Sequence, residues 1–357
     1  MTRTTDNPWL ARFALLTALS TLVLVCLGGL VTSHNAGMAV PDWPNTFGYN
    51  PFFFPISKWV GGIFYEHTHR LVASGVGLLT TILAVWLWLK ESRRWLRWLG
   101  CAAFLAVVLQ GVLGGLRVVW SKDELGIVHA TLGQLFFVLT CSISLFTSRC
   151  WPKERTSPSA DAGQKGLRRV FLLTTLVILG QLLLGAAMRH QHAGLAIPDF
   201  PTAYGKLWPA TDADSVARYN QRRIEATAIN PITASQIVLQ MVHRIVALGI
   251  FCLVGVAAVL TRRQLGWQNP LSKMALIWFG LVVFQIFLGA ATIWTGKSAD
   301  IATAHVACGA LTLMTGTLLS IISFRSLAPV ALPSKTFAKT GTHASFMGGP
   351  TIASDAR

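Results

Sequence analysis

Eight long apolar runs constrain this sequence more than any other feature. Each run is long enough to cross a hydrocarbon core of about 30 Å as a helix of roughly 20 residues. None shows the ten-residue alternation of a membrane β-barrel, and backbone polar groups inside lipid must be paired within the protein, so the runs predict helices. We place the eight spans near residues 13–32, 63–89, 98–119, 127–147, 170–189, 234–260, 274–295 and 301–324.

The charge of the chain does not indicate a soluble basic protein. The sequence has 30 Lys and Arg against 14 Asp and Glu, a net charge of +16 that could suggest nucleic acid as a partner. However, only 12% of the residues are charged and 53% are hydrophobic, whereas soluble domains have about 25% charged residues. A phosphate-binding face needs more solvated charge, so we predict a multipass membrane protein that binds no nucleic acid.

The basic residues also predict the orientation, because cytoplasmic loops retain Lys and Arg. Nineteen of the 30 fall on the side of both chain ends, and nine fall on the opposite side. Both termini are therefore expected in the cytoplasm, and the long loops 33–62 and 190–233 are expected to face outward. The N-terminus has no features of a transit peptide or a cleaved signal peptide. A bacterial plasma membrane is the simplest location.

The chain repeats itself. Residues 36–48, AGMAVPDWPNTFG, match residues 193–205, AGLAIPDFPTAYG, at 7 of 13 positions. Further equivalent pairs are His69 and His243, Arg70 and Arg244, Gln110 and Gln285, Gly114 and Gly289, and His129 and His305. Each half holds an even number of spans, so the two copies share one orientation and are related by an axis along the membrane normal.

We therefore predict an all-α membrane protein built as two tandem, pseudo-symmetric four-helix bundles. Residues 1–147 form the N-terminal bundle and residues 170–324 the C-terminal bundle. A cytoplasmic linker, 148–169, joins them, and a flexible cytoplasmic tail follows at 325–357. Glycines inside the spans let helices approach closely, and they can also clear room for a flat cofactor.

The cysteines predict no structural disulfide. All six lie within spans or beside a cytoplasmic loop rather than in an outward loop, where oxidation is expected. No CxxC or Cys/His metal spacing is present. The six are Cys26, Cys101, Cys141, Cys150, Cys252 and Cys308.

Four of the nine histidines occupy equivalent positions in the outer parts of alternate spans. An ionisable residue at membrane depth costs roughly 2.5 to 3.5 kcal/mol, so each indicates a function. Two histidines from facing helices can ligate one haem iron from both sides, whereas a closed zinc site needs four ligands. We predict one haem-sized site per half, with iron ligands His69 and His129 in the first and His243 and His305 in the second.

One carboxylate distinguishes the halves. Glu66 is the only acidic residue within the predicted spans, and Gln240 replaces it in the second half. Three residues before His69, it lies on the same helix face. Beside a haem it could move a proton or stabilise developing positive charge, and the alternative is a salt bridge with Arg70 or Arg244. The asymmetry indicates chemistry in the first half and an electron-transfer or structural haem in the second.

Other polar residues near these spans have several interpretations. Arg70 and Arg244 follow the proposed ligands, and they either pair with haem propionates or extend to the membrane interface. His67 points away from His69 and is expected at the interface, with recruitment into a flexible site as the alternative. The repeated loops around Pro41 and Pro198 predict rigid turns that could also form lids. Four histidines without repeat partners are expected in solvent: His34, His190, His192 and His343.

In combination, these features resemble the haem A synthase family from about residue 12 to 324. The resemblance rests on the Glu66-x-x-His69-Arg70 motif, the Gly37-x-Ala39-x-Pro41-Asp42-Trp43-Pro44 loop, the paired His129 and His305, and the four-plus-four repeat. It implies oxidation of the C8 methyl group of haem O to the formyl group of haem A, for aa3-type cytochrome oxidases. Such an oxidation removes four electrons in two steps, through a hydroxymethyl intermediate.

The resemblance also implies roles for the site residues. A b-type haem cofactor is expected at His243 and His305, and substrate haem O between His69 and His129, with Glu66 essential for turnover. Haem O carries a long farnesyl tail, which a cavity between lipid-facing helices could admit from the bilayer. Some bacterial members have a cysteine pair in an outward loop, and this chain resembles the branch without it.

Expected partners are haem O, a haem O synthase (farnesyltransferase), an unidentified electron carrier, the lipid bilayer and a second copy of the chain. The main alternative function is a quinol-linked, di-haem b-type electron-transfer protein that modifies no haem. The Glu/Gln asymmetry argues against two equivalent relay haems. A transporter would explain the four matched histidines poorly.

Overall fold

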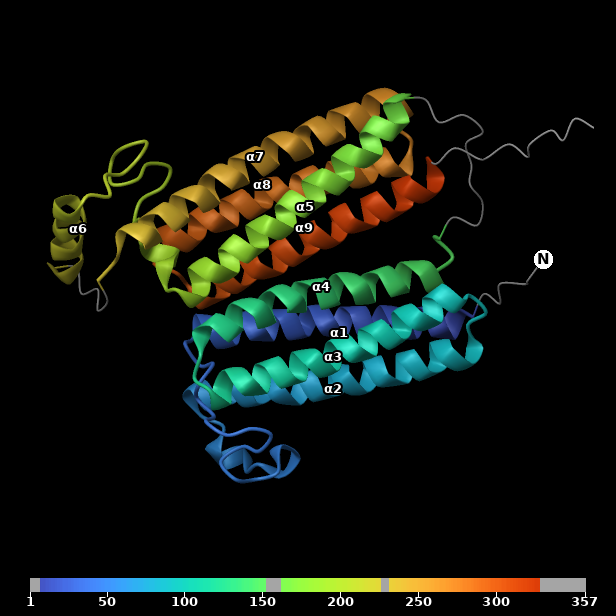
Figure 1. Cartoon of the computed structure of the whole chain (residues 1–357), viewed down its shortest axis with the longest axis horizontal. Helices are drawn as coiled ribbons and strands as arrows, with labels where there is room; N and C mark the ends of the chain where they lie inside the picture. The colour runs from blue at the N-terminus through green and yellow to red at the C-terminus, as the bar shows by residue number, and fades with distance from the viewer. Residues whose placement is uncertain (1–6, 152–161, 226–230, 328–357) are drawn as a thin grey trace, which may run out of the picture.

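The computed structural model describes residues 7–151, 162–225 and 231–327, and the regular secondary structure within them is helical (Figure 1). Within them, the only strand-like pairings are two isolated bridges, Thr46 to Tyr49 and Ala203 to Lys206. The predicted tail beyond residue 327 and residues 152–161 of the predicted linker lie outside the described residues. The α-helices are α1 (Pro8–Ser33), α2 (Gly61–Lys90), α3 (Arg94–Val119), α4 (Asp123–Thr147), α5 (Ala162–His190), α6 (Ala213–Glu225), α7 (Ala234–Leu265), α8 (Pro270–Trp294) and α9 (Ala299–Ser326).

All of these helices except α6 are long and apolar enough to cross a membrane, which confirms the eight predicted spans. Several begin before the apolar run because a polar residue caps them. The side chain of Asn7 accepts hydrogen bonds from the N–H groups of Trp9 and Leu10 at 3.1 and 3.2 Å. Pro8 fills the first position of α1, where a missing N–H costs nothing, and Asn269 starts α8 in the same way.

The early starts of α4 and α9 correct one expectation about charge. Glu124 and Asp300 lie in the first turns of these helices, so Glu66 is not the only acidic residue within the spans. Both of those side chains are exposed, whereas Glu66 keeps only 4% of its surface exposed. Burial, and not the absence of other acids, sets Glu66 apart.

Each set of four long helices forms a closed ring in which every helix packs on two neighbours. The ring order is α1, α2, α3, α4 in the first bundle and α5, α7, α8, α9 in the second. Helices α2 and α4 therefore lie diagonally opposite each other, as α7 and α9 do. The rings meet where α1 and α4 contact α9 and where α4 contacts α5, so α9 is the most enclosed span.

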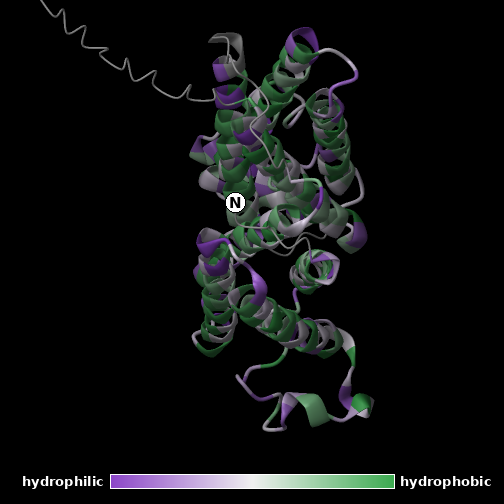
Figure 2. Cartoon of the chain, turned by 90° about the vertical axis from the view of Figure 1, so that its right-hand side faces the viewer, coloured by the Kyte–Doolittle hydropathy of each residue, from purple (hydrophilic) through white to green (hydrophobic). Residues whose placement is uncertain are grey.

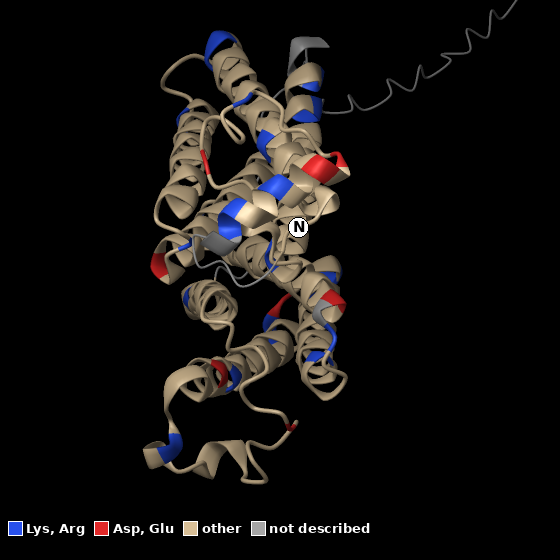
Figure 3. Ribbon diagram, turned by 90° about the vertical axis from the view of Figure 1, so that its left-hand side faces the viewer, with Lys and Arg blue, Asp and Glu red and all other residues tan. Residues whose placement is uncertain are grey.

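Apolar residues predominate along the helices (Figure 2), as lipid-facing helices require. Charged residues gather toward helix ends and in the loops (Figure 3). Small residues let the helices approach each other inside the rings: a Cβ at Gly100 of α3 would lie 2.9 Å from the side chain of Leu87 on α2. All six cysteines belong to the described residues and are free thiols. The two long loops lie at the same end of the molecule, opposite the start of α1 (Figure 1).

The loop between α5 and α7 contains α6, a helix that the sequence analysis did not predict. The ring of Tyr219 on α6 stacks on Tyr204 with centroids 3.7 Å apart. Both residues belong to an apolar cluster with Ile197 and Ile232. A search for long apolar runs cannot find such a helix, because α6 is short and mostly polar.

Candidate functional site

Two histidine pairs lie across the diagonals of the two rings. His69 on α2 pairs with His129 on α4, and His243 on α7 pairs with His305 on α9. Within each pair, the imidazoles are close enough for their charges to interact. All four lie roughly 9 to 14 Å from the start of their helix, counted at 1.5 Å per residue. The structure thus brings together the residues that the sequence paired, and their role as iron ligands stays a prediction.

A glycine of a neighbouring helix packs against each of these imidazoles. A Cβ on that glycine would lie 3.2 to 3.4 Å from the histidine Cε1 atom, a tight contact. The four pairs are Gly28 with His69, Gly114 with His129, Gly185 with His243, and Gly289 with His305. These glycines therefore make room for the imidazole rings as well as for the helix backbones.

The imidazoles have unused hydrogen-bonding capacity. Nδ1 of His69, His243 and His305 is buried without a hydrogen-bond partner in the structure. Buried polar atoms are nearly always paired, so such a nitrogen indicates a place that a bound group completes. Among the described residues, no three His, Cys, Asp or Glu side chains form a metal cluster, so each pair offers two protein ligands. A bis-histidine haem, which needs two, fits this donor set.

Two glutamines to which the sequence analysis gave no role contact these histidines. With its amide oriented to satisfy its neighbours, Gln110 of α3 donates to Nδ1 and the backbone oxygen of His129, at 2.9 and 3.2 Å. Its oxygen then accepts the N–H of Gly133 at 3.1 Å. In the second bundle, the amide nitrogen of Gln285 lies 3.3 Å from Nε2 of His305. Such partners orient a ligating imidazole, and the repeated amide within an apolar span was the available signal.

Glu66 fastens the outer loop of the first half to α2. Its Oε2 accepts the N–H of Val40 at 2.9 Å, and its Oε1 accepts a hydrogen bond from Arg70 at 2.7 Å. Arg70 also donates to three loop carbonyls, those of Val40, Asp42 and Asn45, at 2.9, 2.7 and 3.0 Å. The salt bridge that the sequence left open as an alternative is therefore present, and the carboxylate lies beneath the loop.

The second half makes the same attachment with an amide. Oε1 of Gln240 accepts the N–H of Ile197 at 2.7 Å, and Ile197 is the repeat equivalent of Val40. Nε2 of Gln240 also lies 3.3 Å from the Ile197 carbonyl oxygen. An uncharged side chain is therefore sufficient to hold this loop, and the negative charge of Glu66 is not needed for that task.

Arg244 repeats the loop contacts of Arg70. It donates to the carbonyls of Asp199 and Thr202, at 2.7 and 2.9 Å. Both guanidinium groups are directed at loop backbone and do not simply extend to the interface. Their binding of haem propionates stays a prediction.

An aspartate closes the predicted turn in each loop. The carboxylate of Asp42 accepts the N–H groups of Phe47 and Gly48, both at 2.8 Å, and Asp199 makes the equivalent contacts in the second loop. Burial raises the pKa of Asp42, but the hydrogen bonds from Gly48 and Phe47 outweigh this and lower the pKa below its usual value. The carboxylate therefore stabilises the turn above the unfolded-state pKa of about 3.9, and this stabilisation is lost as the pH falls through the lowered pKa. Gly48 has a φ of 77°, which favours glycine.

The first loop also packs against α3, beside the first histidine pair. A Cβ at Gly115 would overlap the indole of Trp43, so the loop lies directly on this helix. The guanidinium group of Arg117 on α3 packs against Gly37 of the same loop. The preceding glycine, Gly114, contacts His129, so the loop covers the outer end of the first site.

Two basic residues, treated in the sequence only as outward charges, lie near the histidine pairs. Arg117 lies close to both histidines of the first pair, and Arg189 lies close to His305. Arg189 of α5 donates to the carbonyl of Gly29 and to the hydroxyl of Ser33 on α1. A cation from the second ring is thus anchored in the first, which only the packing of the rings reveals.

His67 corrects an expectation. It was expected at the interface but is fully buried beneath the first loop. Its Nδ1 lies 3.2 Å from the hydroxyl of Thr46, and its ring packs against Phe54 and Trp59 with centroid distances of 5.0 and 4.8 Å. The prediction failed because the loop folds back over this face of α2.

His190 also differs from expectation. It was expected in solvent but keeps only 8% of its surface exposed, because it packs against α4 at Gly126. His34 and His192 are exposed, as predicted. His343 lies outside the described residues.

Comparison with known proteins places this architecture in a family. A family model described as cytochrome oxidase assembly protein, COX15-CtaA, matches residues 11–317. A relative from Halalkalibacterium halodurans, named "Heme A synthase", is 25% identical over 298 residues, which cover 82% of this chain and 90% of the relative. Proteins of the same name from Geobacillus kaustophilus and Shewanella oneidensis are 26% and 24% identical, over 82% and 86% of this chain and 84% and 93% of their own lengths. Because the family model covers most of the sequence, this chain belongs to the COX15-CtaA family of cytochrome oxidase assembly proteins.

Proposed function

We propose that the chain is a membrane enzyme that oxidises the C8 methyl group of haem O to the formyl group of haem A. The family membership and the relatives named "Heme A synthase" support a role in haem A formation. The two histidine pairs, each with two protein ligands for an iron, support two haem sites in one chain. Overall, the methyl group takes up one oxygen atom, formally that of a water molecule, and releases four electrons and four protons. This occurs in two two-electron steps through a hydroxymethyl intermediate, and the electrons pass to an electron carrier.

The difference between Glu66 and Gln240 carries the assignment of roles to the two halves. Both side chains accept the N–H of the same loop position, so holding the loop does not explain the carboxylate. A carboxylate can also accept a proton from the substrate or stabilise developing positive charge, which an amide cannot do. Haem O therefore binds between His69 and His129, with Glu66 as the catalytic residue.

Haem b binds between His243 and His305, where it supplies one-electron redox chemistry. The glycine contacts and the orphaned Nδ1 atoms support this site as they support the first. Gln285 contacts Nε2 of His305, whereas Gln110 contacts Nδ1 of His129, and each amide orients one imidazole. Residues 193–195 of the loop attached to Gln240 contact α5 and α7, at the end of the bundle where this site lies.

The proposed setting is a bacterial plasma membrane, with both termini in the cytoplasm and both haem sites toward the outer face. The bias of Lys and Arg supports this orientation, as does the position of both long loops at one end of the bundles (Figure 1). The two bundles are related by a pseudo-twofold axis along the membrane normal. A haem O synthase delivers the substrate, and a second copy of the chain is a further candidate partner.

The test is conversion of haem O by the purified protein, compared between wild type, Glu66→Gln and Gln240→Glu. Haem extraction and chromatography measure the product. Wild type and Gln240→Glu should form haem A, whereas Glu66→Gln should keep its haems and its loop but react at least about 100-fold more slowly. If the Glu66→Gln variant forms haem A at the normal rate, the catalytic role of Glu66 is contradicted. If the wild-type protein leaves haem O unchanged, the result supports a di-haem electron carrier instead.

A further inference from the structure

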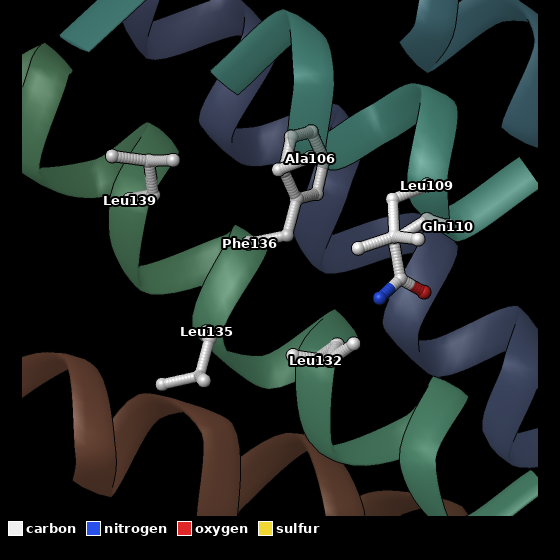
Figure 4. A pocket seen from close by; sticks show the side chains of 7 residues that line it. All are labelled: Ala106, Leu109, Gln110, Leu132, Leu135, Phe136 and Leu139. Carbon is white, nitrogen blue, oxygen red and sulfur yellow. The ribbon is translucent and has the colours of Figure 1, made fainter. Parts of the chain in front are cut away.

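We propose that the apolar pocket between α3 and α4 of the first bundle receives the isoprenoid tail of the substrate haem and selects haem O over haem B. This inference rests on the proposed function and deepens it. The pocket has a volume of about 120 Å³. Its lining residues are Ala106, Leu109, Gln110, Leu132, Leu135, Phe136 and Leu139 (Figure 4).

The pocket adjoins the first histidine pair. Gln110, the one polar residue in the lining, is also the residue whose amide contacts His129. A porphyrin held between His69 and His129 would therefore have this pocket beside one of its axial ligands. The pocket is far too small for the porphyrin itself, but it suits a short length of hydrocarbon.

The pocket reaches the surface that faces lipid. The side chains of Leu109 and Leu135 on its rim are 49% and 39% exposed, whereas Phe136 at its inner wall is only 4% exposed. A hydrocarbon chain can enter such a pocket directly from the bilayer, and the length of tail beyond it can remain in lipid. Burial of apolar groups in a matching pocket stabilises binding by about 0.8 kcal/mol for each CH2 group, relative to water.

The helix that carries the glutamine has bulkier side chains in the second bundle. The repeat that aligns Gln110 with Gln285 also aligns Ala106 with Leu281 and Ala103 with Trp278. Trp278 is completely buried, and its indole N–H donates to the carbonyl of Thr312 at 2.8 Å. Helix α8, in the half proposed to hold haem b, thus has Leu281 where α3 has the pocket residue Ala106. On the helix opposite, the repeat aligns the pocket residue Phe136 with Thr312, so the two bundles share the space differently.

Replacement of Ala106 by the residue of the other half tests the proposal. Ala106→Leu would fill the pocket, and Leu281→Ala is the matched control in the second bundle. Full-length protein containing its resident haem is titrated with haem O and, separately, with haem B, and binding is followed by the Soret absorbance. We expect Ala106→Leu to raise the Kd for haem O about tenfold, because roughly two CH2 groups of the tail would no longer be buried. The Kd for haem B should change less than twofold.

Three outcomes would overturn the proposal. Equal weakening of both haems would show a general distortion of the site, and no weakening of either would show that the pocket holds a lipid acyl chain or nothing. An equal effect of Leu281→Ala on haem O would show that the pocket is not specific to the first half. Ala106→Val, which adds less volume, should give an intermediate Kd if the larger variant folds poorly. If the wild-type protein converts haem O and Ala106→Leu still prefers haem O over haem B to the same degree, only the role of the pocket is rejected. If the wild-type protein does not convert haem O, the proposed function itself is rejected.

Discussion

In the first bundle a carboxylate, Glu66, accepts the N–H of Val40, and in the second bundle an amide, Gln240, accepts the N–H of Ile197. The helix order, the histidine positions, the glycine contacts and the loop attachment are otherwise equivalent in the two bundles. Because so much is shared, the few differences identify what each half does in addition to holding its loop and its histidines. The carboxylate and the apolar pocket occur in the same half, which is the half expected to bind and oxidise the substrate.

The largest expected difference between the two bundles comes from removing one histidine of each pair and measuring which haem is lost. His69→Ala should lose the substrate haem and keep the resident haem b, whereas His243→Ala should lose haem b, because each change removes an axial ligand from one ring only. Both variants should lose activity. Haem extraction and chromatography of the purified proteins measure which haem remains.

The exposed His192 provides the control, since His192→Ala should retain both haems. Loss of the same haem from His69→Ala and His243→Ala would mean that the two bundles are not separate sites.

A smaller effect is expected from the glutamines that contact the histidines. Gln110→Leu should weaken haem O binding by about 10- to 100-fold and leave haem b in place, and Gln285→Leu should do the reverse. The reason is that each amide fixes the orientation of one imidazole. Electron paramagnetic resonance of the ferric protein reports this orientation, because the spectrum of a bis-histidine haem depends on its axial ligands.

A purely structural role for the glutamines makes a different prediction. In that case Gln110→Leu would lower thermal stability while the resonance spectrum of the bound haem stayed unchanged.

The smallest effect is expected from the glycines that pack on the imidazoles. Gly28→Ala should weaken haem binding in the first bundle about fivefold, and Gly185→Ala should do so in the second, because the added Cβ presses on the histidine ring and costs roughly 1 kcal/mol. Soret titration measures both. Gly75→Ala and Gly249→Ala are matched controls, since a Cβ at either position meets no atom within 4 Å. Equal effects at all four positions would contradict a specific role for the ring contacts.

Much of the fold could be predicted because its signals are local. A run of apolar residues identifies a span by its length alone, and the eight spans were found in this way. His67 and His190 were predicted at the interface or in solvent but are buried, because a loop or a helix from elsewhere in the chain covers each of them. Helix α6 was missed for a different reason, because it is short and mostly polar and so does not form a long apolar run.

The features of the candidate site also separate into those that are visible in the sequence and those that depend on packing. The sequence by itself determined that two equivalent sets of four spans each carry two histidines, and that one set has Glu66 where the other has Gln240. Only the tertiary structure decided that the histidines lie across ring diagonals, that Gln110 contacts His129, that the carboxylate lies under its loop, and that an apolar pocket adjoins Gln110. The physical reason is that membrane insertion depends on the composition of each segment separately, whereas these contacts depend on which helix faces lie together.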